Sequence, residues 1–406
     1  MKLLVFNCGS SSLKFQVIEL DEKTLLGQQR RLAHGLIEKI GDRGKFKFAA
    51  EGSDPFQESH TFTDHGSAFR RVILWLESKG FLGKNGITAV GHRVVHGGNR
   101  FVEPALLDSD VVAAIEAIRD LAPLHNDPSL KAIRAARTVM GPSVPMVAVF
   151  DTAFHSNMPE RASTYAIPRE LGQKHQIRRF GFHGLAHRYL AERYAALTAT
   201  PLVQIKIITL QLGNGCSATA VQGGRSLDNS MGLTPLEGLM MGTRSGDVDP
   251  HLPGYLARIE GVDIEEVEEW LNSRSGLLGV SGVSQDMRDL MEAERRGDGN
   301  AALAVEMFCY RVRKQIGAYL AVLGGADSVL FGGGIGENSP EVRSRICTGM
   351  EWCGLTLDGE RNAAAIGSED RISADSARVH AYVIPVDEEV MIARDTLRCL
   401  GLSRGR

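Results

Sequence analysis

A polar turn near the start of the chain carries the first group of residues suited to phosphate chemistry. It spans residues 7–14 (NCGSSSLK) and follows a short apolar run, residues 3–6. Backbone amides, serine hydroxyls and an ammonium group can together surround phosphate oxygens. The turn lacks the Gly-Lys-Ser/Thr ending of a P-loop, and on spacing alone an ordinary serine- and glycine-rich hairpin is the more frequent explanation. The side chains that could bind phosphate are Asn7, Ser10, Ser12 and Lys14.

Two further glycine-rich segments could bring backbone close to a nucleotide, as glycine permits. They are residues 212–217 (LGNGCS) and 332–338 (GGGIGEN), and each is a weak signal by itself. The first lies within residues 206–221, which repeat the design of the opening segment: an apolar strand, a polar turn and a second strand. This repetition predicts an internal duplication.

Apolar periodicity divides the chain into alternating helices and strands. A period of about 3.6 predicts helices over residues 66–79, 109–121, 130–139, 187–196, 263–273 and 301–323. Short apolar runs predict strands over residues 3–6, 13–20, 89–95, 146–150, 328–331 and 381–384. Several of these strands run directly into Gly, Asp or Glu clusters, so we expect an α/β fold with functional loops at the strand ends.

The two halves of the duplication place a domain boundary near the strand that ends at Phe150. The segment from Asp387 onward has the pattern of an amphipathic helix, which we expect to fold back onto the first domain. The predicted lobes are therefore residues 1–150 together with about 387–406, and residues 151–386.

Composition argues for small-molecule partners. The 406 residues are 43% hydrophobic and carry a net charge of −3, from 46 basic and 49 acidic residues, which provides no field for nucleic acid. The six cysteines lack zinc-site spacing and are expected to be reduced thiols. No uninterrupted apolar run of about 18 residues predicts a membrane span, and the start of the chain is too short for a signal-peptide core, so we expect a cytoplasmic protein.

Essentially the whole chain resembles the acetate kinase family. After the turn at residues 7–14, the resemblance runs in order through GHRVVHGG (91–98), APLHN (122–126), VAVFDTAFH (147–155), GFHG (181–184), LGNG (212–215), SMGLTPLEGLMMGTRSGDVDP (230–250), SGLLGVSG (275–282), GGIGENSP (333–340) and EEVMIARDT (388–396). It implies a duplicated actin-like, sugar-kinase-like (ribonuclease H-like) fold with an active-site cleft between the domains. It also implies ATP and ADP as co-substrates, Mg²⁺ with Mn²⁺ as the alternative, and a homodimer formed through the second lobe.

The resemblance also suggests roles for individual residues. Arg93 and Arg244 would bind the reacting phosphoryl group and the carboxylate, because a guanidinium can do so bidentately. An arginine taken at random more often forms a structural ion pair, and a lone aspartate such as Asp151 more often caps a helix. The implied catalytic set is Asp151, Arg93, Arg244, His183 and His125, with His183 as the main transition-state donor. The implied metal ligands are Asn7 and Glu388, although the adjacent Glu389 is not separable from Glu388 by sequence.

The resemblance further implies a nucleotide site and an acyl pocket. The nucleotide site would be formed, besides the first turn, by Gln211, Gly213, Asn214, Gly215, Asp286, Met287, Arg288, Gly334, Ile335, Gly336 and Asn338. The acyl pocket would be formed by Val95, Leu124, Phe182 and Pro235 beside Arg93. On the residues alone, the four pocket residues are ordinary core positions.

Four departures from the family pattern stand out. Gln211 replaces the usual histidine before LGNG, which puts one phosphate contact in doubt. Leu185 and Ala186 replace a Thr-Ser pair. Gly332 and Gly333 replace bulkier residues and predict a roomy adenosine entrance, and Asp387 replaces an asparagine and predicts extra negative charge at the metal site.

The implied reaction is direct in-line transfer of the ATP γ-phosphoryl group to acetate, giving acetyl phosphate and ADP. The acid is already ionised at neutral pH, so no general base is needed. Two alternatives remain. One is the same chemistry on propionate or butyrate, because one methylene is worth only about 1–3 kcal/mol of discrimination. The other is a non-enzymatic nucleotide-binding module of the actin/Hsp70 kind.

Overall fold

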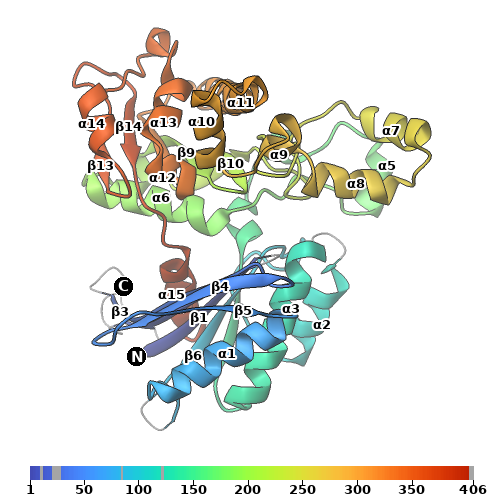
Figure 1. The fold of residues 1–406 in the computed structure, drawn as a ribbon, viewed down its shortest axis with the longest axis vertical. Helices are drawn as coiled ribbons and strands as arrows, with labels where there is room; N and C mark the ends of the chain where they lie inside the picture. The colour runs from blue at the N-terminus through green and yellow to red at the C-terminus, as the bar shows by residue number, and fades with distance from the viewer. Residues whose placement is uncertain (10–11, 21–28, 84–85, 120–122, 402–406) are drawn as a thin grey trace. The chain divides into compact units, whose positions relative to one another are not determined.

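The chain folds into two compact units. The computed structural model describes residues 1–9, 12–20, 29–83, 86–119 and 123–401 (Figure 1). One unit joins residues 1–153 to the C-terminal segment that starts at Asp387, and the other comprises residues 154–386.

The first unit is built on a mixed sheet. Among the described residues its strands run in the order β5-β4-β3-β2-β1-β6-β8-β7. Strands β1 to β3 pair antiparallel, whereas β1, β6 and β8 pair in parallel. The elements are β1 (Lys2–Cys8), β2 (Ser12–Glu19), β3 (Arg30–Glu38), β4 (Arg43–Ala50), β5 (Phe56–Thr61), α1 (His65–Ser78), β6 (Ala89–Val94), β7 (Ala105–Leu106), α2 (Ser109–Ala117), α3 (Pro123–Met140), β8 (Met146–Phe150) and α15 (Glu388–Cys399).

The second unit repeats this plan. Its described strands run in the order β11-β10-β9-β12-β14-β13, again with an antiparallel hairpin beside parallel strands. The predicted internal duplication is therefore confirmed. The elements are α4 (Glu160–Ser163), α5 (Arg169–Lys174), α6 (Gly184–Leu197), β9 (Lys206–Leu212), β10 (Cys216–Gln222), β11 (Arg225–Asn229), α7 (Leu252–Glu260), α8 (Ile264–Ser273), α9 (Gly276–Ser281), α10 (Met287–Arg295), α11 (Gly299–Leu323), β12 (Ser328–Gly332), α12 (Gly333–Asn338), α13 (Pro340–Cys347), α14 (Gly359–Ala364), β13 (Asp370–Arg371) and β14 (His380–Val383).

Most predicted helices agree with the observed ones to within a few residues. The main difference is α3, which begins at Pro123 rather than at Leu130 and contains Pro128. Proline lacks the backbone N–H and usually ends a helical pattern, so pattern reading misses this first part. Among the described residues, no helix is long and apolar enough to cross a bilayer.

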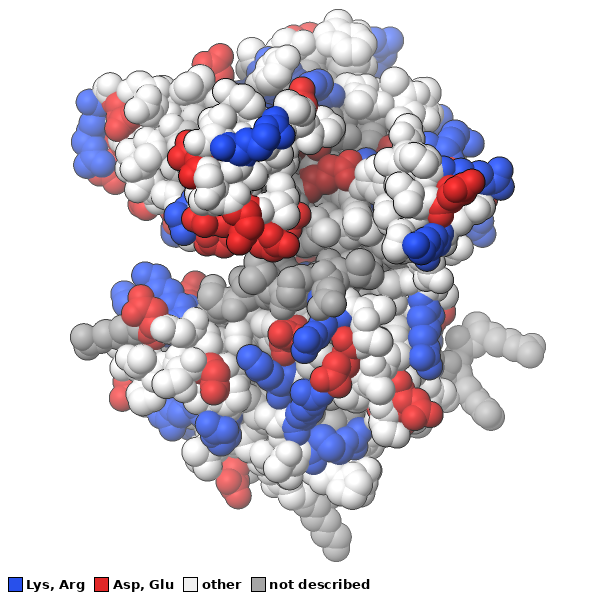
Figure 2. Space-filling model, turned by 90° about the vertical axis from the view of Figure 1, so that its right-hand side faces the viewer, with Lys and Arg blue, Asp and Glu red and all other residues white. Residues whose placement is uncertain are grey.

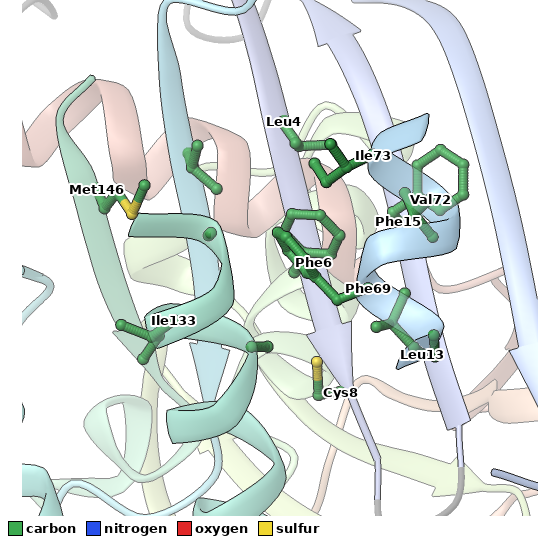
Figure 3. Packing of buried hydrophobic residues seen from close by; sticks show 14 of the residues in the cluster. Leu4, Phe6, Cys8, Leu13, Phe15, Phe69, Val72, Ile73, Ile133 and Met146 are labelled. Carbon is green, nitrogen blue, oxygen red and sulfur yellow. The ribbon is translucent and has the colours of Figure 1, made fainter. Parts of the chain in front are cut away.

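Helices cover both faces of the first sheet. Helices α1 and α3 pack on one face and α15 on the other, across β1, β6 and β8. On the α1 side, Phe6 packs against Phe69 with ring centroids 4.8 Å apart, in a cluster that includes Val72 and Ile133 (Figure 3). Each such side chain contributes about 1.5–3 kcal/mol when fully buried. This packing fixes which strand residues face α15.

The surface of the first unit carries both signs of charge. On the face shown in Figure 2, lysine and arginine side chains are interspersed with aspartate and glutamate over the lower part of the picture.

A buried histidine in the first core makes stability depend on pH. His92 is 1% exposed and stacks on Phe6, and its Nε2 has no hydrogen-bond partner within the described part of the chain. Burial lowers the pKa of His92 to about 3. On acidification the unfolded chain therefore binds a proton at His92 before the folded chain does. The contribution of His92 to stability is fully present above about pH 6.5 and is lost as the pH falls toward about 3.

We expect the His92→Phe variant to lose this pH dependence. Its free energy of unfolding should fall less steeply on acidification than that of the wild type, by about 1.4 kcal/mol per pH unit below about pH 6. Urea unfolding between about pH 7 and about pH 5 measures the difference. His175→Phe at an exposed position is the matched control. An unchanged pH slope in His92→Phe would show that His92 is not held neutral by the fold.

Candidate functional site

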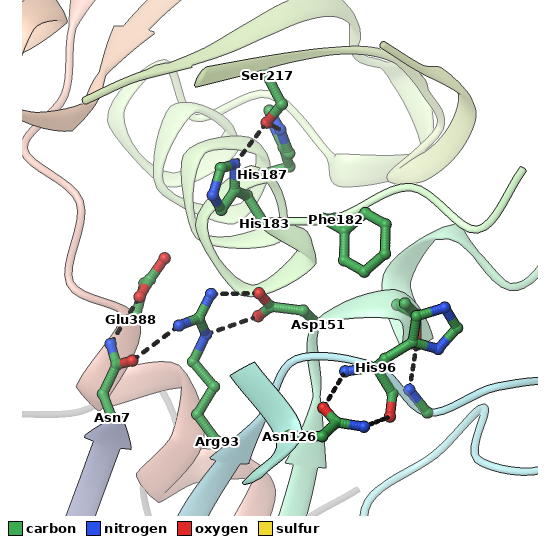
Figure 4. A network of polar contacts seen from close by, with 12 residues as sticks. Asn7, Arg93, His96, Asn126, Asp151, Phe182, His183, His187, Ser217 and Glu388 are labelled. Atoms are coloured by element: carbon green, nitrogen blue, oxygen red, sulfur yellow. Dashed lines mark hydrogen bonds and ion pairs between the residues drawn. The ribbon is translucent and has the colours of Figure 1, made fainter. Parts of the chain in front are cut away.

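Three polar side chains of the first unit lie on the α15 face of the sheet because strand side chains alternate. Phe6 in β1 and Phe150 in β8 face the α1 core. Asn7 follows Phe6 within β1 and therefore faces the other way, and Asp151 begins the 3₁₀ helix Asp151–His155 directly after β8. Arg93 of β6 reaches the same side, where its guanidinium contacts both (Figure 4).

The Arg93 guanidinium is held on two edges. Its Nε donates to Asp151 Oδ1 at 3.1 Å, its Nη2 donates to Asp151 Oδ2, and its Nη1 donates to Asn7 Oδ1 at 2.9 Å. The Arg93 side chain is 11% exposed and that of Asp151 is 0% exposed. Burial opposes the charge on Arg93, but the carboxylates of Asp151 and Glu388 outweigh it and raise its pKa. The group is thus a fixed, permanently charged cation suited to binding an anion.

Asn7 also links the sheet to the first turn of α15. Its Nδ2 donates to Glu388 Oε2 at 2.7 Å and to Glu389 Oε1 at 3.0 Å (Figure 4). The second oxygen of Glu389 accepts from Gln16 Nε2 at 3.3 Å. Burial raises the pKa of Glu389, partly offset by Lys14 and by the Asn7 hydrogen bond. Glu389 is thus buried and accepts two hydrogen bonds, whereas Glu388 is only half-buried.

The oxygens of Asn7 and Glu388 are of the type that Mg²⁺ prefers. Within the described residues, no group of three or more His, Cys, Asp or Glu side chains is arranged to hold a metal. A protein contribution of one or two oxygens is usual for Mg²⁺ bound with nucleotide phosphates. Of the two adjacent glutamates, Glu388 fits this role better because it is only half-buried, whereas Glu389 is buried.

The predicted extra charge of Asp387 acts on its neighbour Glu389, whose pKa it helps to raise. Asp387 Oδ2 pairs with Arg31 Nη2 at 2.8 Å, and its Oδ1 accepts from the Val390 amide at 3.2 Å. The carboxylate therefore caps α15 and pairs with an arginine of β3. Arg31 therefore offsets part of this negative charge, and the rest still acts on Glu389.

A second polar cluster holds the loop that follows β6. Asn126 is fully buried; its Oδ1 accepts from the His96 amide and its Nδ2 donates to the His96 carbonyl, both at 3.1 Å (Figure 4). The Gly97 amide donates to Thr152 Oγ1 at 3.0 Å. These contacts fix Val95, which is buried, just beyond Arg93. The sequence interpretation missed Asn126, although it lies in the APLHN motif.

In the second unit, Arg244 and His183 both lie beside the turn between β9 and β10. A Cβ on Gly215 would lie 3.4 Å from His183 Nε2 and 3.7 Å from Arg244 Nη1. Arg244 Nη1 donates to the Pro235 carbonyl at 3.0 Å, which ties a predicted pocket residue to the arginine. Two predicted catalytic residues of this unit are therefore brought together at the predicted nucleotide turn.

His183 is held by a chain of buried polar groups. It caps α6 in the left-handed region, φ 54°, which is uncommon for a residue other than glycine. Its Nδ1 is 2.8 Å from Ser217 Oγ, which is also 2.8 Å from His187 Nε2 (Figure 4). His187 Nδ1 lies 2.8 Å from Thr209 Oγ1, and burial lowers the pKa of His187 well below its usual value. Ser217 and Thr209, which the sequence interpretation did not single out, thus orient the ring of His183.

The glycine-rich segment after β12 forms the short helix α12. Hydrogen bonds to the side chains of Glu337 and Arg343 hold its backbone in place. Glu337 Oε1 accepts from the amides of Gly333 and Val386 at 2.8 and 3.0 Å. Arg343 is 0% exposed and donates to the carbonyls of Gly336 and Glu337 at 2.8 and 3.2 Å, and burial lowers its pKa to about 10. The sequence interpretation missed Arg343, because nothing in its local pattern marks it as buried.

The roomy adenosine entrance that is predicted from Gly332 and Gly333 does not follow from the space at these two glycines. A Cβ on Gly333 would lie 2.7 Å from backbone atoms of Leu212, and one on Gly332 would lie 2.7 Å from Val386 and 3.1 Å from Leu190. Neighbouring atoms already fill the space that these glycines leave. Gly333 also has φ +76°, which favours glycine.

The other predicted nucleotide residues are spread over the second unit. Asp286 caps α10 and pairs with Arg288, which is 90% exposed, while Met287 is buried. Asn338 Nδ2 donates to the Gly334 carbonyl at 3.0 Å. Gln211 Oε1 is a buried acceptor without a hydrogen-bond partner among the described residues.

Three predicted site residues cannot be compared with the structure, and three more differ from one another in exposure. Ser10 and the side chains of Leu124 and His125 lie outside the described residues. In the first unit Lys14 is exposed and Ser12 is half-buried, and in the second Phe182 is 1% exposed.

Each of the two sheets has an antiparallel hairpin next to parallel strands, and the first sheet carries the further edge strands β4 and β5; this is a duplicated fold of the actin-like class. The acetokinase family matches residues 2–394 of the chain. The acetate kinase of Solibacter usitatus is 49% identical over 407 residues, with 98% of each chain covered. This chain therefore belongs to the acetokinase family, whose members are kinases with a carboxylate acceptor and with ATP and ADP as substrates.

Two solved structures are similar over nearly the full length. The acetate kinase of Porphyromonas gingivalis is 40% identical with a TM-score of 0.88, covering 98% of this chain and 99% of that chain. A propionate kinase from Francisella tularensis is 39% identical with a TM-score of 0.89 and the same coverage. Overall similarity therefore does not separate the two acids.

Proposed function

We propose that this kinase transfers the γ-phosphoryl group of ATP directly to acetate, giving acetyl phosphate and ADP, and that it also catalyses the reverse transfer. The observation that carries this proposal is the environment of Arg93. Its buried guanidinium is held by Asp151 and Asn7 beside parallel strand ends, and is suited to bind a small carboxylate or a phosphoryl oxygen.

The proposed chemistry relies on positioning and charge. A carboxylate is ionised at neutral pH and attacks phosphorus without a general base. The P–O bond to ADP breaks as the P–O bond to the acid forms, and charge spreads over the equatorial oxygens. We assign stabilisation of that charge to Arg93, Arg244 and His183, with His125 in support. Asp151 orients the Arg93 guanidinium and balances its charge.

Glu388 and Asn7 are the proposed protein ligands of Mg²⁺, with Mn²⁺ as the alternative ion. When bound with the nucleotide, such a cation neutralises phosphate charge. The choice of Glu388 over Glu389 is supported by exposure, because Glu388 is only half-buried, whereas Glu389 is buried and accepts from Asn7 and Gln16. We assign to Glu389 the task of orienting Asn7.

The nucleotide is proposed to bind through backbone and side chains of both hairpin turns and of α12. In the second unit, Gly213, Asn214 and Gly215 would approach the phosphates, and the Asp286–Arg288 segment would flank the adenosine. Gln211, in place of a histidine, cannot add charge there. Its unpartnered Oε1 is an acceptor that a donor of the bound nucleotide could satisfy.

Propionate is the second candidate acid. It is favoured by the similarity to the Francisella tularensis propionate kinase. Apolar residues proposed to contact the acyl chain are Val95, Leu124, Phe182 and Pro235. One added methylene changes binding by only about 1–3 kcal/mol, so the preference is a matter of degree.

A hydroxamate assay tests the proposed reaction, because hydroxylamine traps an acyl phosphate as it forms. With ATP, Mg²⁺ and each of acetate, propionate and butyrate, we expect the highest kcat/KM for acetate. Omitting Mg²⁺ and adding EDTA should abolish the signal. ATP binding without acid-dependent hydroxamate would instead support a non-enzymatic module, and a higher kcat/KM for propionate would reassign the substrate.

We also infer a cytoplasmic homodimer. All six cysteines are free thiols, which is typical of proteins in a reducing compartment. Apolar side chains are exposed on α7, at Tyr255 and Ile259, and on α11, at Leu303 and Tyr310, and we assign such exposed apolar residues to contacts with a second copy. Sedimentation equilibrium measures this association, and a monomer at micromolar concentration would contradict it.

A further inference from the structure

The segment that carries Arg244 belongs to no helix or strand, yet its backbone is held almost residue by residue. Residues 241–244 close on themselves through a hydrogen bond from the Met241 amide to the Arg244 carbonyl at 3.1 Å. Met241 is 0% exposed. A loop of this kind can place a side chain accurately only if its surroundings prevent it from moving.

The start of α9 supplies one side of this support. The amides of Ser275, Leu277 and Leu278 donate to the carbonyls of Thr243, Met241 and Gly242, each at 2.9 Å. Thr243 Oγ1 donates to the Asn272 carbonyl, also at 2.9 Å.

The predicted nucleotide turn supplies the other side. The Gly242 amide donates to the Asn214 carbonyl at 2.9 Å. A Cβ on Gly242 would lie 1.9 Å from Asn214 Oδ1. The Arg244 segment is therefore packed between α9 and the turn between β9 and β10.

Gly276 leaves no room for a side chain between α9 and this segment. A Cβ at Gly276 would lie 2.2 Å from the Met241 carbonyl oxygen and 2.7 Å from the Arg244 carbonyl oxygen. It would also lie 3.1 Å from the Arg244 backbone nitrogen. These are backbone atoms that cannot rotate away as a side chain can. A side chain at Gly276 must therefore move the turn that carries Arg244.

We propose that Gly276 is a positioning residue for Arg244: its lack of a side chain lets α9 pack directly against residues 241–244 and so fixes where the guanidinium lies. The inference rests on the proposed role of Arg244 in phosphoryl transfer. A displacement of about 1 Å in a catalytic group can reduce the rate by about a hundredfold. The loss should appear in kcat, because Arg244 is proposed to act on the charge that develops during transfer.

Gly282, which caps the C-terminus of α9, provides a matched control. Gly276 and Gly282 have φ +61° and φ +66°, so alanine is strained to a similar degree at both. No atom lies within 4 Å of a Cβ at Gly282. The two alanine variants therefore differ in whether they press on the Arg244 segment.

The test is a double-mutant cycle between Gly276→Ala and Arg244→Ala, measured as hydroxamate formation per folded protein. We expect Gly276→Ala to lower kcat by about a hundredfold, with KM for ATP and acetate changed less than about threefold, and Gly282→Ala to keep the wild-type kcat. In the Arg244→Ala background, Gly276→Ala should cost less than about threefold more, because the group that it displaces is gone.

Each other outcome has a defined meaning. Equal losses in both backgrounds, or a folded Gly276→Ala variant with wild-type kcat, would overturn the inference while leaving the proposed function in place. Wild-type turnover of Arg244→Ala would overturn the proposed role of Arg244 and the inference with it. If Gly276→Ala does not fold, Thr243→Val, which removes the bond to Asn272, replaces it in the cycle, and the same non-additivity is required.

Discussion

Turnover of the Arg244→Ala variant is expected to fall by about 10²–10³-fold, which is the usual cost of removing one preorganised group that stabilises transition-state charge. The protein should remain folded, because backbone hydrogen bonds from α9 hold residues 241–244 independently of the arginine side chain. The side chain itself contacts the Pro235 carbonyl and Met241 Sδ, at 3.0 and 3.6 Å. Hydroxamate formation and thermal unfolding, measured on the same preparation, separate the two effects.

Two further variants sharpen this prediction. Arg244→Lys keeps the charge but not the planar fork, and should recover only part of the activity. Arg274→Ala removes an exposed arginine, paired with Glu269, and should leave turnover unchanged. Near-wild-type turnover of a folded Arg244→Ala protein would remove this arginine from the site.

The second large effect concerns the Arg93–Asp151 pair. Asp151→Asn keeps the shape of the side chain but leaves the Arg93 guanidinium charged, nearly buried and without its carboxylate. Breaking a buried pair by removing one partner costs about 3–5 kcal/mol of stability. Turnover should fall as well, because the guanidinium loses the group that orients it. Urea unfolding and hydroxamate formation measure the two losses.

A double variant separates stability from catalysis. Arg93→Met combined with Asp151→Leu replaces the pair by apolar side chains of similar size, a change that is often neutral or stabilising. We expect the double variant to be more stable than Asp151→Asn but to be inactive. Wild-type turnover of the double variant would contradict the proposed role of Arg93, and wild-type stability of Asp151→Asn would contradict the energetic account.

The general plan of the molecule could be predicted from the sequence because it depends on local signals. Period-2 and period-3.6 apolar patterns indicated the α/β alternation, and the repeated strand-turn-strand segment at residues 206–221 indicated the duplication that the strand orders confirm. The helix that starts at Pro123 was missed in part, because an internal proline interrupts the pattern.

The burial and the ion-pair partners of individual charged residues could not be predicted from the sequence. Glu388 and Glu389 are adjacent in sequence, and only the packing of α15 on the sheet buries one and leaves the other half-exposed. The balance of Asp387 by Arg31 depends on residues 356 positions apart. The ion-pair partner of a charged residue can be distant in the sequence, so it is known only from the tertiary structure.

The sequence by itself determined the family, the order of elements and the residue types available for phosphoryl transfer, since motifs and periodicity are properties of short segments. The tertiary structure alone decided how those residues are supported: Ser217 and His187 behind His183, Asn7 between Arg93 and Glu388, and Gly276 under the Arg244 segment. The reason is physical. Hydrogen bonds and van der Waals contacts act over a few ångströms, and which distant residues come that close is set by the packing of sheets and helices.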